Sequence, residues 1–260
     1  MKAIRRGLLI ILVLLFSLAL FSCEDMKEGL NYKKTEDGKG YTVVKYVGDE
    51  KVVEIPSEYK GLPVVAIDSY AFSGRDNLET IYIPESVETI GQYAFFRCNK
   101  LLDATIPGVK SLGENAFAGC EYLTYIYIPA SLESIGNGAF SDCKRIAEIH
   151  VAEENAKYYV TDNCLIETET KTLVLGCKNS IIPTDGSVTS IGYGAFDGCS
   201  ELKSIAIPKS ITNIGELAFN NCSGLEAVYY AGTTAEWDAI TIGKHNYQFE
   251  GTVRYFSVNN

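Results

Sequence analysis

The sequence predicts a solenoid, a fold in which short coils of chain stack on one another along one axis. Three observations indicate it: a recurring Ala-Phe pair, a proline that closes short apolar segments, and a cysteine at a fixed distance after the pair. The pair occurs six times, with neighbouring copies 23, 22, 23, 56 and 23 residues apart, at Ala71-Phe72, Ala94-Phe95, Ala116-Phe117, Ala139-Phe140, Ala195-Phe196 and Ala218-Phe219. Because one unit has too few apolar residues to form a core alone, the units must stack.

The unit from Leu123 to Cys143 shows the physical logic of one coil. In Ile126-Tyr127-Ile128 apolar residues alternate with an outward residue, which predicts a short strand with one buried face. Pro129 ends the strand because it cannot donate a hydrogen bond to a neighbouring strand. Gly136 follows where we expect neither a side chain nor a negative φ to fit. A period of 22 or 23 residues with this apolar core is typical of leucine-rich repeats.

We therefore predict a leucine-rich-repeat solenoid that is mostly β, with short helical or 3-10 turns. The strand positions give about eight stacked coils, centred near Ile55, Ile83, Ile106, Ile128, Val151, Ile182, Ile207 and Tyr230. Residues 156–177 interrupt the repeat, and their apolar runs around a polar turn predict a β-hairpin insertion. Residues 40–56, which contain strand-like runs at 41–47 and 51–55, are predicted to form an N-terminal cap, and residues 231–256 a C-terminal cap.

Residues 1–22 have the pattern of an export signal. Three basic residues precede an almost unbroken apolar run, Gly7 to Phe21, which is too short for a membrane-spanning helix. The end of this segment resembles the processing site of bacterial lipoproteins, which implies that Cys23 is lipidated; ordinary signal cleavage is the alternative. Residues 23–39 are polar and are predicted to tether the domain to a membrane.

The charge of the chain excludes some partners. Its net charge is −10 at pH 7, and removal of the three basic residues in residues 1–22 makes it −13. An acidic surface disfavours binding to nucleic acid or to anionic lipid. We therefore predict contact with a membrane through a lipid anchor only.

The repeated phrase Ile-x-Ile-Pro-x-x-Val-x-x-Ile-Gly-x-x-Ala-Phe-x-x-Cys resembles the BspA-like leucine-rich-repeat family of bacterial cell-surface proteins. The resemblance covers residues 40–256, including the interruption. It implies the leucine-rich-repeat fold and a role in adhesion to host matrix or plasma proteins or to other cells. It brings no catalytic motif with it.

Cysteine occupies one slot of the repeat, three residues after the Phe, in five of the six copies: Cys98, Cys120, Cys143, Cys199 and Cys222. Parallel side chains rarely reach the dihedral of about 90° that a disulfide needs, so we predict a ladder of buried free thiols. Cys164 and Cys177 differ, because folding the hairpin about Thr170 places them opposite each other. A disulfide between them is left open. No Cys-x-x-Cys pair is present, so no metal site is predicted.

The candidate binding site is the row of outward side chains on the predicted strands. Stacking brings them onto one exposed, concave sheet, and amphipathic side chains suit a binding surface; the candidates are Tyr82, Thr105, Tyr125, Tyr127, His150 and Tyr229. The alternative is that Tyr and Thr stand there only because they suit exposed β positions. No Cys or carboxylate stands at nucleophilic spacing from a histidine, so no catalytic residue is predicted.

These observations predict a non-enzymatic cell-surface protein, and in particular an adhesin for a host matrix or plasma protein or for another cell. A structural or glycan-capturing lipoprotein of the cell envelope is the alternative. We expect an exported monomer, lipid-anchored to the outer membrane and facing outward, that binds a protein or glycan and uses no cofactor.

Overall fold

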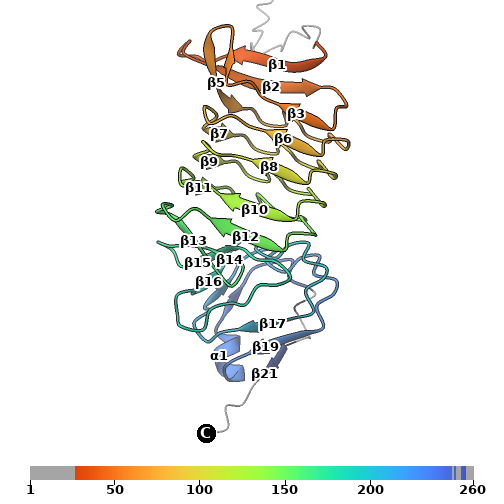
Figure 1. The fold of residues 1–260 in the computed structure, drawn as a ribbon. Helices are drawn as coiled ribbons and strands as arrows, with labels where there is room; N and C mark the ends of the chain where they lie inside the picture. The colour runs from red at the N-terminus through yellow and green to blue at the C-terminus, as the bar shows by residue number, and fades with distance from the viewer. Residues whose placement is uncertain (1–26, 248, 250–252, 256–260) are drawn as a thin grey trace, which may run out of the picture.

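The computed structural model describes residues 27–247, 249 and 253–255. In this part of the chain the polypeptide winds into one elongated stack of coils, with the first strands at one end and the last at the other (Figure 1). Nearly all of its regular structure is strand, and its helix, α1 (Thr234–Asp238), has five residues. The structure confirms the predicted mostly β solenoid. No segment in the described ranges qualifies as a membrane-spanning helix.

One short strand from most of the coils contributes to parallel ladders along one side of the stack. These strands are β3 (Val52–Glu54), β6 (Thr80–Tyr82), β8 (Asp103–Thr105), β10 (Tyr125–Ile128), β12 (Glu148–Val151), β17 (Ser204–Ile207), β19 (Ala227–Tyr230) and β21 (Val253–Tyr255). In β10 the tyrosines are exposed and the isoleucines buried, as the alternating pattern predicts. We call the outward side of these strands the strand face.

A second set of strands, most of them two residues long, runs along another side of the stack, and the sequence analysis does not predict it. It comprises β5 (Leu62–Ile67), β7 (Thr89–Ile90), β9 (Ser111–Leu112), β11 (Ser134–Ile135), β16 (Ser190–Ile191), β18 (Asn213–Ile214) and β20 (Thr241–Ile242). The glycine of the repeat follows most of these strands directly. A Cβ on Gly136 would lie 2.5 Å from the backbone nitrogen of Glu114, so glycine lets successive coils approach closely. Its φ is not positive, so the close approach is the reason for this glycine.

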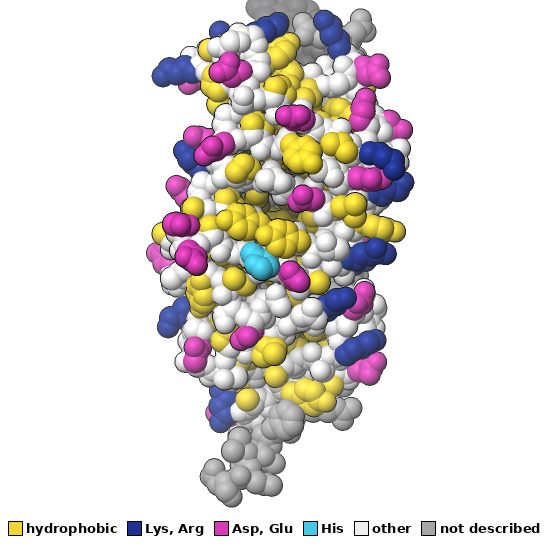
Figure 2. Space-filling model, in the orientation of Figure 1, with side chains coloured by type: hydrophobic (Ala, Val, Ile, Leu, Met, Phe, Trp, Pro, Cys, Tyr) yellow, Lys and Arg dark blue, Asp and Glu magenta, His cyan; other side chains and the backbone are white. Residues whose placement is uncertain are grey.

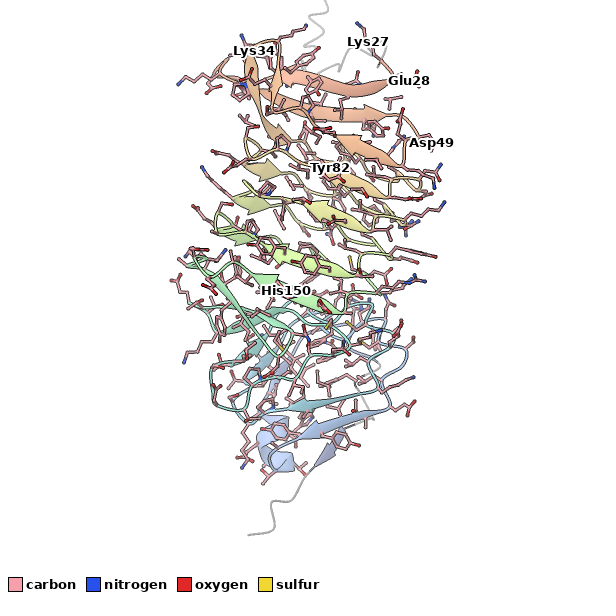
Figure 3. The ribbon with its side chains drawn as sticks, in the orientation of Figure 1. Lys27, Glu28, Lys34, Asp49, Tyr82 and His150 are labelled. Carbon is pink, nitrogen blue, oxygen red and sulfur yellow. The ribbon has the colours of Figure 1, made fainter. Side chains whose placement is uncertain are left out.

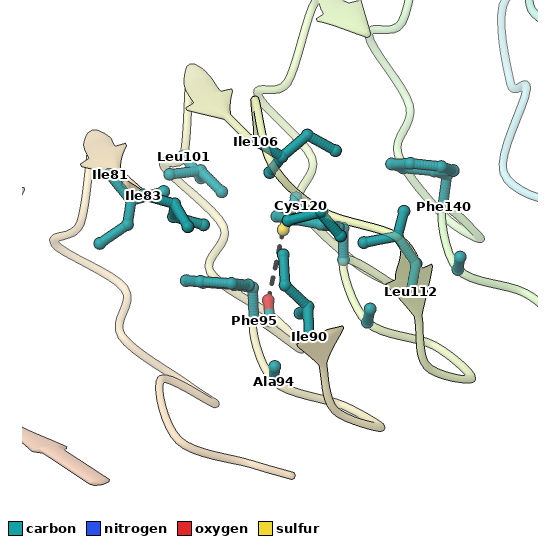
Figure 4. Packing of buried hydrophobic residues seen from close by; sticks show 14 of the residues in the cluster. Ile81, Ile83, Ile90, Ala94, Phe95, Leu101, Ile106, Leu112, Cys120 and Phe140 are labelled. Atoms are coloured by element: carbon teal, nitrogen blue, oxygen red, sulfur yellow. Dashed lines mark hydrogen bonds between the residues drawn. The ribbon is translucent and has the colours of Figure 1, made fainter. Parts of the chain in front are cut away.

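Phe rings and thiols fill the space between coils. The ring centroids of Phe72 and Phe95 are 5.0 Å apart, and those of Phe95 and Phe117 are 4.9 Å apart. The Sγ of Cys120 lies 3.3 Å from the carbonyl oxygen of Phe95, to which it donates (Figure 4). The same thiol-to-carbonyl contact links Cys98 to the coil before it, at 3.2 Å. Each coil is therefore joined to its neighbour through the core as well as through its strands.

The insertion is a meander of three strands, one more than a single hairpin: β13 (Tyr158–Thr161), β14 (Cys164–Glu167) and β15 (Thr172–Leu175). β15 pairs in parallel with β16 and so serves as the second strand of its own coil. Gly176 follows β15 at the position of the repeat's Phe. A Cβ there would lie 2.1 Å from the ring of Phe196, so the ring packs against bare backbone. The insertion thus interrupts the Phe stack and divides the buried residues into two clusters.

The coil predicted to centre on Ile182 has no strand there. Ile182 is buried, but Ile181 is 65% exposed, and residues 181–183, all within the described part, form no ladder pair. The physical reason is that the N–H of Ile181 donates to the carbonyl of Asp162 in the insertion, at 3.0 Å, and not to a parallel strand. The strand face is consequently interrupted between β12 and β17.

The polar tether predicted for residues 23–39 is wrong from Gly29 onward. Gly29–Lys34 forms strand β1, which pairs antiparallel with β2 (Tyr41–Val47). Tyr32 stacks on Tyr59 of β4 (Glu58–Tyr59), with ring centroids 4.0 Å apart. The domain therefore begins before residue 40, because β1 covers the open end of the first coil. The predicted export signal and Cys23 lie outside the described residues.

The C-terminal cap contains α1 and β21. Thr233 and Glu236 form a reciprocal capping box at the start of α1. The indole of Trp237 packs on Phe249 at a centroid distance of 5.4 Å, and β21 pairs in parallel with β19. The helix and this strand cover the last regular coil.

Candidate binding face

The structure brings five of the six predicted site residues onto one stretch of the strand face, between β6 and β12. Tyr82 and Thr105 are register partners on β6 and β8, and Tyr127 and His150 are register partners on β10 and β12. Tyr82 and His150, labelled in Figure 3, both lie on this side of the stack. All five side chains are exposed.

Tyr229 does not join this group. It is half-buried on β19, in the separate ladder formed by β17, β19 and β21. The expectation of one continuous exposed sheet is wrong, because the insertion separates that ladder from β12. The candidate binding face is therefore limited to the N-terminal part of the stack.

The centre of this face is an aromatic group made by Tyr125, Tyr127 and His150. Tyr125 and Tyr127 are 40% and 47% exposed, which is high for such large rings. The rings of Tyr125 and His150 lie diagonally across β10 and β12, with centroids 5.1 Å apart. We call these three side chains the aromatic patch. Figure 2 shows hydrophobic side chains gathered at the middle of this face and a small hollow among them.

Carboxylates border the aromatic patch. Glu148 is the register partner of Tyr125, and its Oε2 lies 3.5 Å from Nε2 of His150. Burial raises the pKa of Tyr125, and the nearby Tyr127, Asp103 and Glu148 raise it further. The tyrosine hydroxyl therefore stays neutral at physiological pH. Neutral aromatic rings beside carboxylates attract a cation, through the ring faces and through direct charge pairing.

The hollow lies between β8 and β10, which are not hydrogen-bonded as a ladder in the described structure. It is a cavity of about 10 Å³, lined by Ile106, Phe117, Leu123 and the two tyrosines of β10, among other side chains. That volume holds about one water molecule, so the hollow does not take a ligand of its own.

Sequence reasoning did not identify one aromatic–cation pair in the turns that precede β10 and β12. Tyr122 is 40% exposed, and the guanidinium of Arg145 lies 3.9 Å from its ring centroid. Both residues are in turns between strands, where no alternating pattern marks the direction of a side chain. The signal that could have found them is their spacing of 23 residues, one period of the repeat.

The thiols give no reactive centre in the described residues. All five cysteines of the ladder are buried and free, and burial raises the pKa of Cys98, Cys143 and Cys222 to about 12. The disulfide left open between Cys164 and Cys177 is not formed in this part of the chain. Their Sγ atoms instead face the carbonyls of Ile181 and Ala147, at 3.5 and 3.6 Å. Among the described residues no group of His, Cys, Asp and Glu could hold a metal ion.

Comparison with known proteins identifies the family of this chain. A model of the BspA type leucine rich repeat region matches residues 65–185 and 175–246, with six copies. These residues are more than half of the chain. The chain belongs to the BspA-type leucine-rich-repeat family. Comparison with curated proteins found no match to this chain.

The chain is similar to solved structures of other bacterial proteins. The pneumococcal vaccine antigen PcpA is 21% identical, with a TM-score of 0.57, over 76% of this chain and 53% of that one. A leucine-rich repeat protein from Bacteroides ovatus is 22% identical, with a TM-score of 0.50, over 90% of this chain and 72% of that one. The T. pallidum leucine-rich repeat protein TpLRR is 23% identical, with a TM-score of 0.48, over 76% and 91% of the two chains. At identities of 21% and 22%, the first two of these structures show a shared fold and nothing further.

Proposed function

We propose that this protein is a non-enzymatic cell-surface adhesin that binds a protein ligand through the aromatic patch on its strand face. The observation that carries the proposal is the exposure of three amphipathic rings side by side between Asp103 and Glu148. Rings of this kind are enriched in protein interfaces because they offer a large contact area at low entropic cost. The family to which the chain belongs supports a binding role for this solenoid.

The charge around the patch indicates the chemistry of the ligand. The chain carries a net charge of −10, and the carboxylates of Asp103 and Glu148 stand beside the rings. A ligand segment rich in Lys or Arg would satisfy both the carboxylates and the ring faces. We therefore propose a basic segment of a host matrix or plasma protein, or of a surface protein of another cell, as the ligand.

The same proposal includes the location of the protein. Export through residues 1–22, lipidation of Cys23 and anchoring to the outer membrane would hold the strand face outside the cell. Mass spectrometry of the membrane-extracted protein tests this part, because a lipidated Cys23 would be the first residue and would carry acyl chains. A mature chain that starts elsewhere without a lipid would contradict it.

The binding proposal is tested on an array of matrix proteins, plasma proteins and glycans, probed with the full chain in detergent. We expect at least one basic protein to bind, and its affinity to fall as salt rises from 50 to about 500 mM because exposed charges are screened. The double variant Tyr125→Ala/Tyr127→Ala should lose at least about tenfold in affinity, since two interface rings are removed.

A matched control variant distinguishes a binding site on the strand face from a general effect of removing exposed tyrosines. Tyr70 and Tyr247 are 50% and 66% exposed but stand away from the strand face, so Tyr70→Ala/Tyr247→Ala should bind normally. Equal loss in both double variants would count against a site on the strand face. A saturable oligosaccharide ligand, with no protein ligand, would favour the glycan-capturing lipoprotein instead.

A further inference from the structure

The insertion leaves two backbone N–H groups without partners. In a regular coil, two N–H groups around the Ala-Phe pair donate to carbonyls of the following coil, as Tyr93 donates to Glu114 at 2.9 Å and Phe95 to Ala116 at 2.7 Å. The corresponding groups in the coil before the insertion belong to Gly138 and Phe140. Both residues are buried, and neither N–H has a hydrogen-bond partner among the described residues. Buried N–H groups without partners are rare and costly.

The last coil shows that this position needs a partner. No further Ala-Phe unit follows Phe219, and its N–H is accepted by the side-chain Oδ1 of Asn246 at 2.9 Å. Asn246 is itself only 1% exposed, and its amide also donates to Gly215 and Gly243, so it is held in place to do this. At the end of the stack a side-chain oxygen therefore replaces the backbone carbonyl that would accept this N–H. The break at Phe140 has no such replacement.

A cavity occupies the space that the following coil leaves. Gly176 stands at the Phe position of the next coil, and its N–H donates onward to Ala195 at 2.8 Å as in a regular coil, but among the described residues no carbonyl of the insertion accepts the N–H of Phe140. The cavity measures about 160 Å³. Residues 136–141 line one wall, residues 192–194 another, and the insertion contributes Tyr158, Glu167, Thr172 and Val174, among others.

The size of the cavity limits what it can hold. A cavity of about 150 Å³ elsewhere accepts one six-membered ring, whereas sites for drug-sized ligands need roughly 300 Å³ or more. One ring with its substituents thus matches the space. An apolar ring would leave the N–H groups of Gly138 and Phe140 unsatisfied, so the ring must carry acceptors.

The polar groups favour a neutral ring that carries both donors and acceptors. Gly138 and Phe140 supply two N–H donors, and Tyr158 and Thr172 supply hydroxyls. Glu167 supplies a carboxylate acceptor on the same wall. Burial, followed by the Glu167 carboxylate, raises the pKa of Tyr158 to about 12, so its hydroxyl is a neutral donor. Since Glu167 would repel an anion, hydroxyl groups are the acceptors that suit the two N–H donors.

We propose that this cavity binds a single neutral pyranose unit, with its hydroxyl oxygens on the N–H groups of Gly138 and Phe140 and a hydroxyl hydrogen on Glu167. The site lies beside the second set of strands and not on the strand face, although Phe140 lines both this cavity and the small hollow next to the aromatic patch. It would take either a free monosaccharide or the terminal unit of a longer glycan, because both present the same ring.

The test uses the full chain and saturation-transfer NMR, with the methyl pyranosides of glucose, galactose, mannose and N-acetylglucosamine as probes. We expect at least one to bind with a Kd of about 1 mM or tighter. Methyl glucuronide has the same ring with a carboxylate, and it should give no signal. A second probe is an oligosaccharide whose terminal unit is the monosaccharide that binds. If the oligosaccharide binds as well, the natural ligand is the end of a glycan. If only the monosaccharide binds, the natural ligand is a free sugar.

Two variants locate the site. Val174→Phe fills the cavity from its half-buried wall and should abolish the signal, and Glu167→Gln should weaken binding at least fivefold. Glu169→Gln is the matched control, since Glu169 is an exposed residue of the turn after β14 and pairs with Lys157 at 3.3 Å. It should bind like the original chain, as should Tyr125→Ala/Tyr127→Ala. The proposal is overturned if no pyranoside binds, or if binding persists in both cavity variants.

Discussion

At the scale of single residues, the slot that follows each Phe explains why cysteine recurs in this chain. The slot is buried between coils and faces a backbone carbonyl of the coil before it, as Cys143 faces Phe117 and Cys222 faces Phe196, at 3.2 and 3.1 Å. A thiol is small enough for this space and donates weakly to the carbonyl. The ionised thiol would lose that donor and carry a buried charge, so folding favours the neutral form.

Because folding favours the neutral thiols, we expect the folded protein to become less stable at alkaline pH. The thiol pKa rises from an ordinary 9.0 to about 12 on folding for Cys98, Cys143 and Cys222. Their contribution is complete below pH 9 and is lost as the pH rises from 9 towards 12, where only the unfolded chain ionises. Each such thiol should lower the free energy of unfolding by about 1.4 kcal/mol per pH unit in that range.

Urea unfolding at several pH values between 7 and about 10.5 measures this effect, in the range where the unfolded thiols ionise. The variant Cys222→Ala is less stable at every pH because it loses a buried contact, but it should show a shallower decline than the original chain. Parallel curves for the two proteins would contradict this account of the slot. A steady decline that already begins below pH 8 would contradict it as well.

At the scale of elements, the N-terminal cap shows how β1 completes the fold. β1 pairs with β2, and Leu30 and Tyr32 pack against the core. These contacts protect the first coil, whose edge would otherwise be open to pairing with another chain. The domain is therefore closed by the segment that the sequence presents as polar.

Two truncated chains test the cap. A chain of residues 27–260 keeps β1, and we expect it to remain monomeric. A chain of residues 40–260 should lose about 2 to 4 kcal/mol in its free energy of unfolding, because the half-buried Leu30 and Tyr32 are removed. It should also self-associate through β2. Equal stability and equal sedimentation of the two chains would show that β1 does not act as a cap.

Sequence patterns predicted some elements well and others not at all, for physical reasons. Tyr125-Ile126-Tyr127-Ile128 alternates cleanly, so its strand and its exposed rings were predictable. β9 and β11 have two residues each and are too short for any period to appear. β1 has only two apolar side chains among polar ones, so composition alone favoured a tether. The separation of Tyr229 from the aromatic patch depends on the path of the insertion, which no local pattern encodes.

At the scale of the whole molecule, the insertion divides the solenoid into two cores. The buried residues of the N-terminal cluster extend from Val43 to the insertion, and those of the C-terminal cluster extend from the insertion to Phe249. The Phe stack is broken between Phe140 and Phe196, where Gly176 replaces a ring. Because each coil of a solenoid contacts only its neighbours, cooperativity depends on such junctions.

This division predicts unfolding in two stages. Trp237 is the one tryptophan of the chain and belongs to the C-terminal cluster, so its fluorescence reports only that part. Circular dichroism reports all of the strands. We expect the two signals to give different midpoints in urea, because a two-state protein would give coincident ones. Coincident transitions would show that the insertion couples the two cores fully.

The aromatic patch connects all three scales, since its rings depend on the alternation within β10, on the register with β12 and on the N-terminal part of the stack. Hydroxyl-radical footprinting of the full chain, with and without a protein ligand from the array, tests its role most directly. The account predicts that the ligand slows oxidation of Tyr125 and Tyr127 and leaves Tyr70 and Tyr247 unchanged. Unchanged oxidation of Tyr125 and Tyr127 while bound ligand protects another surface would contradict the assignment of the binding face.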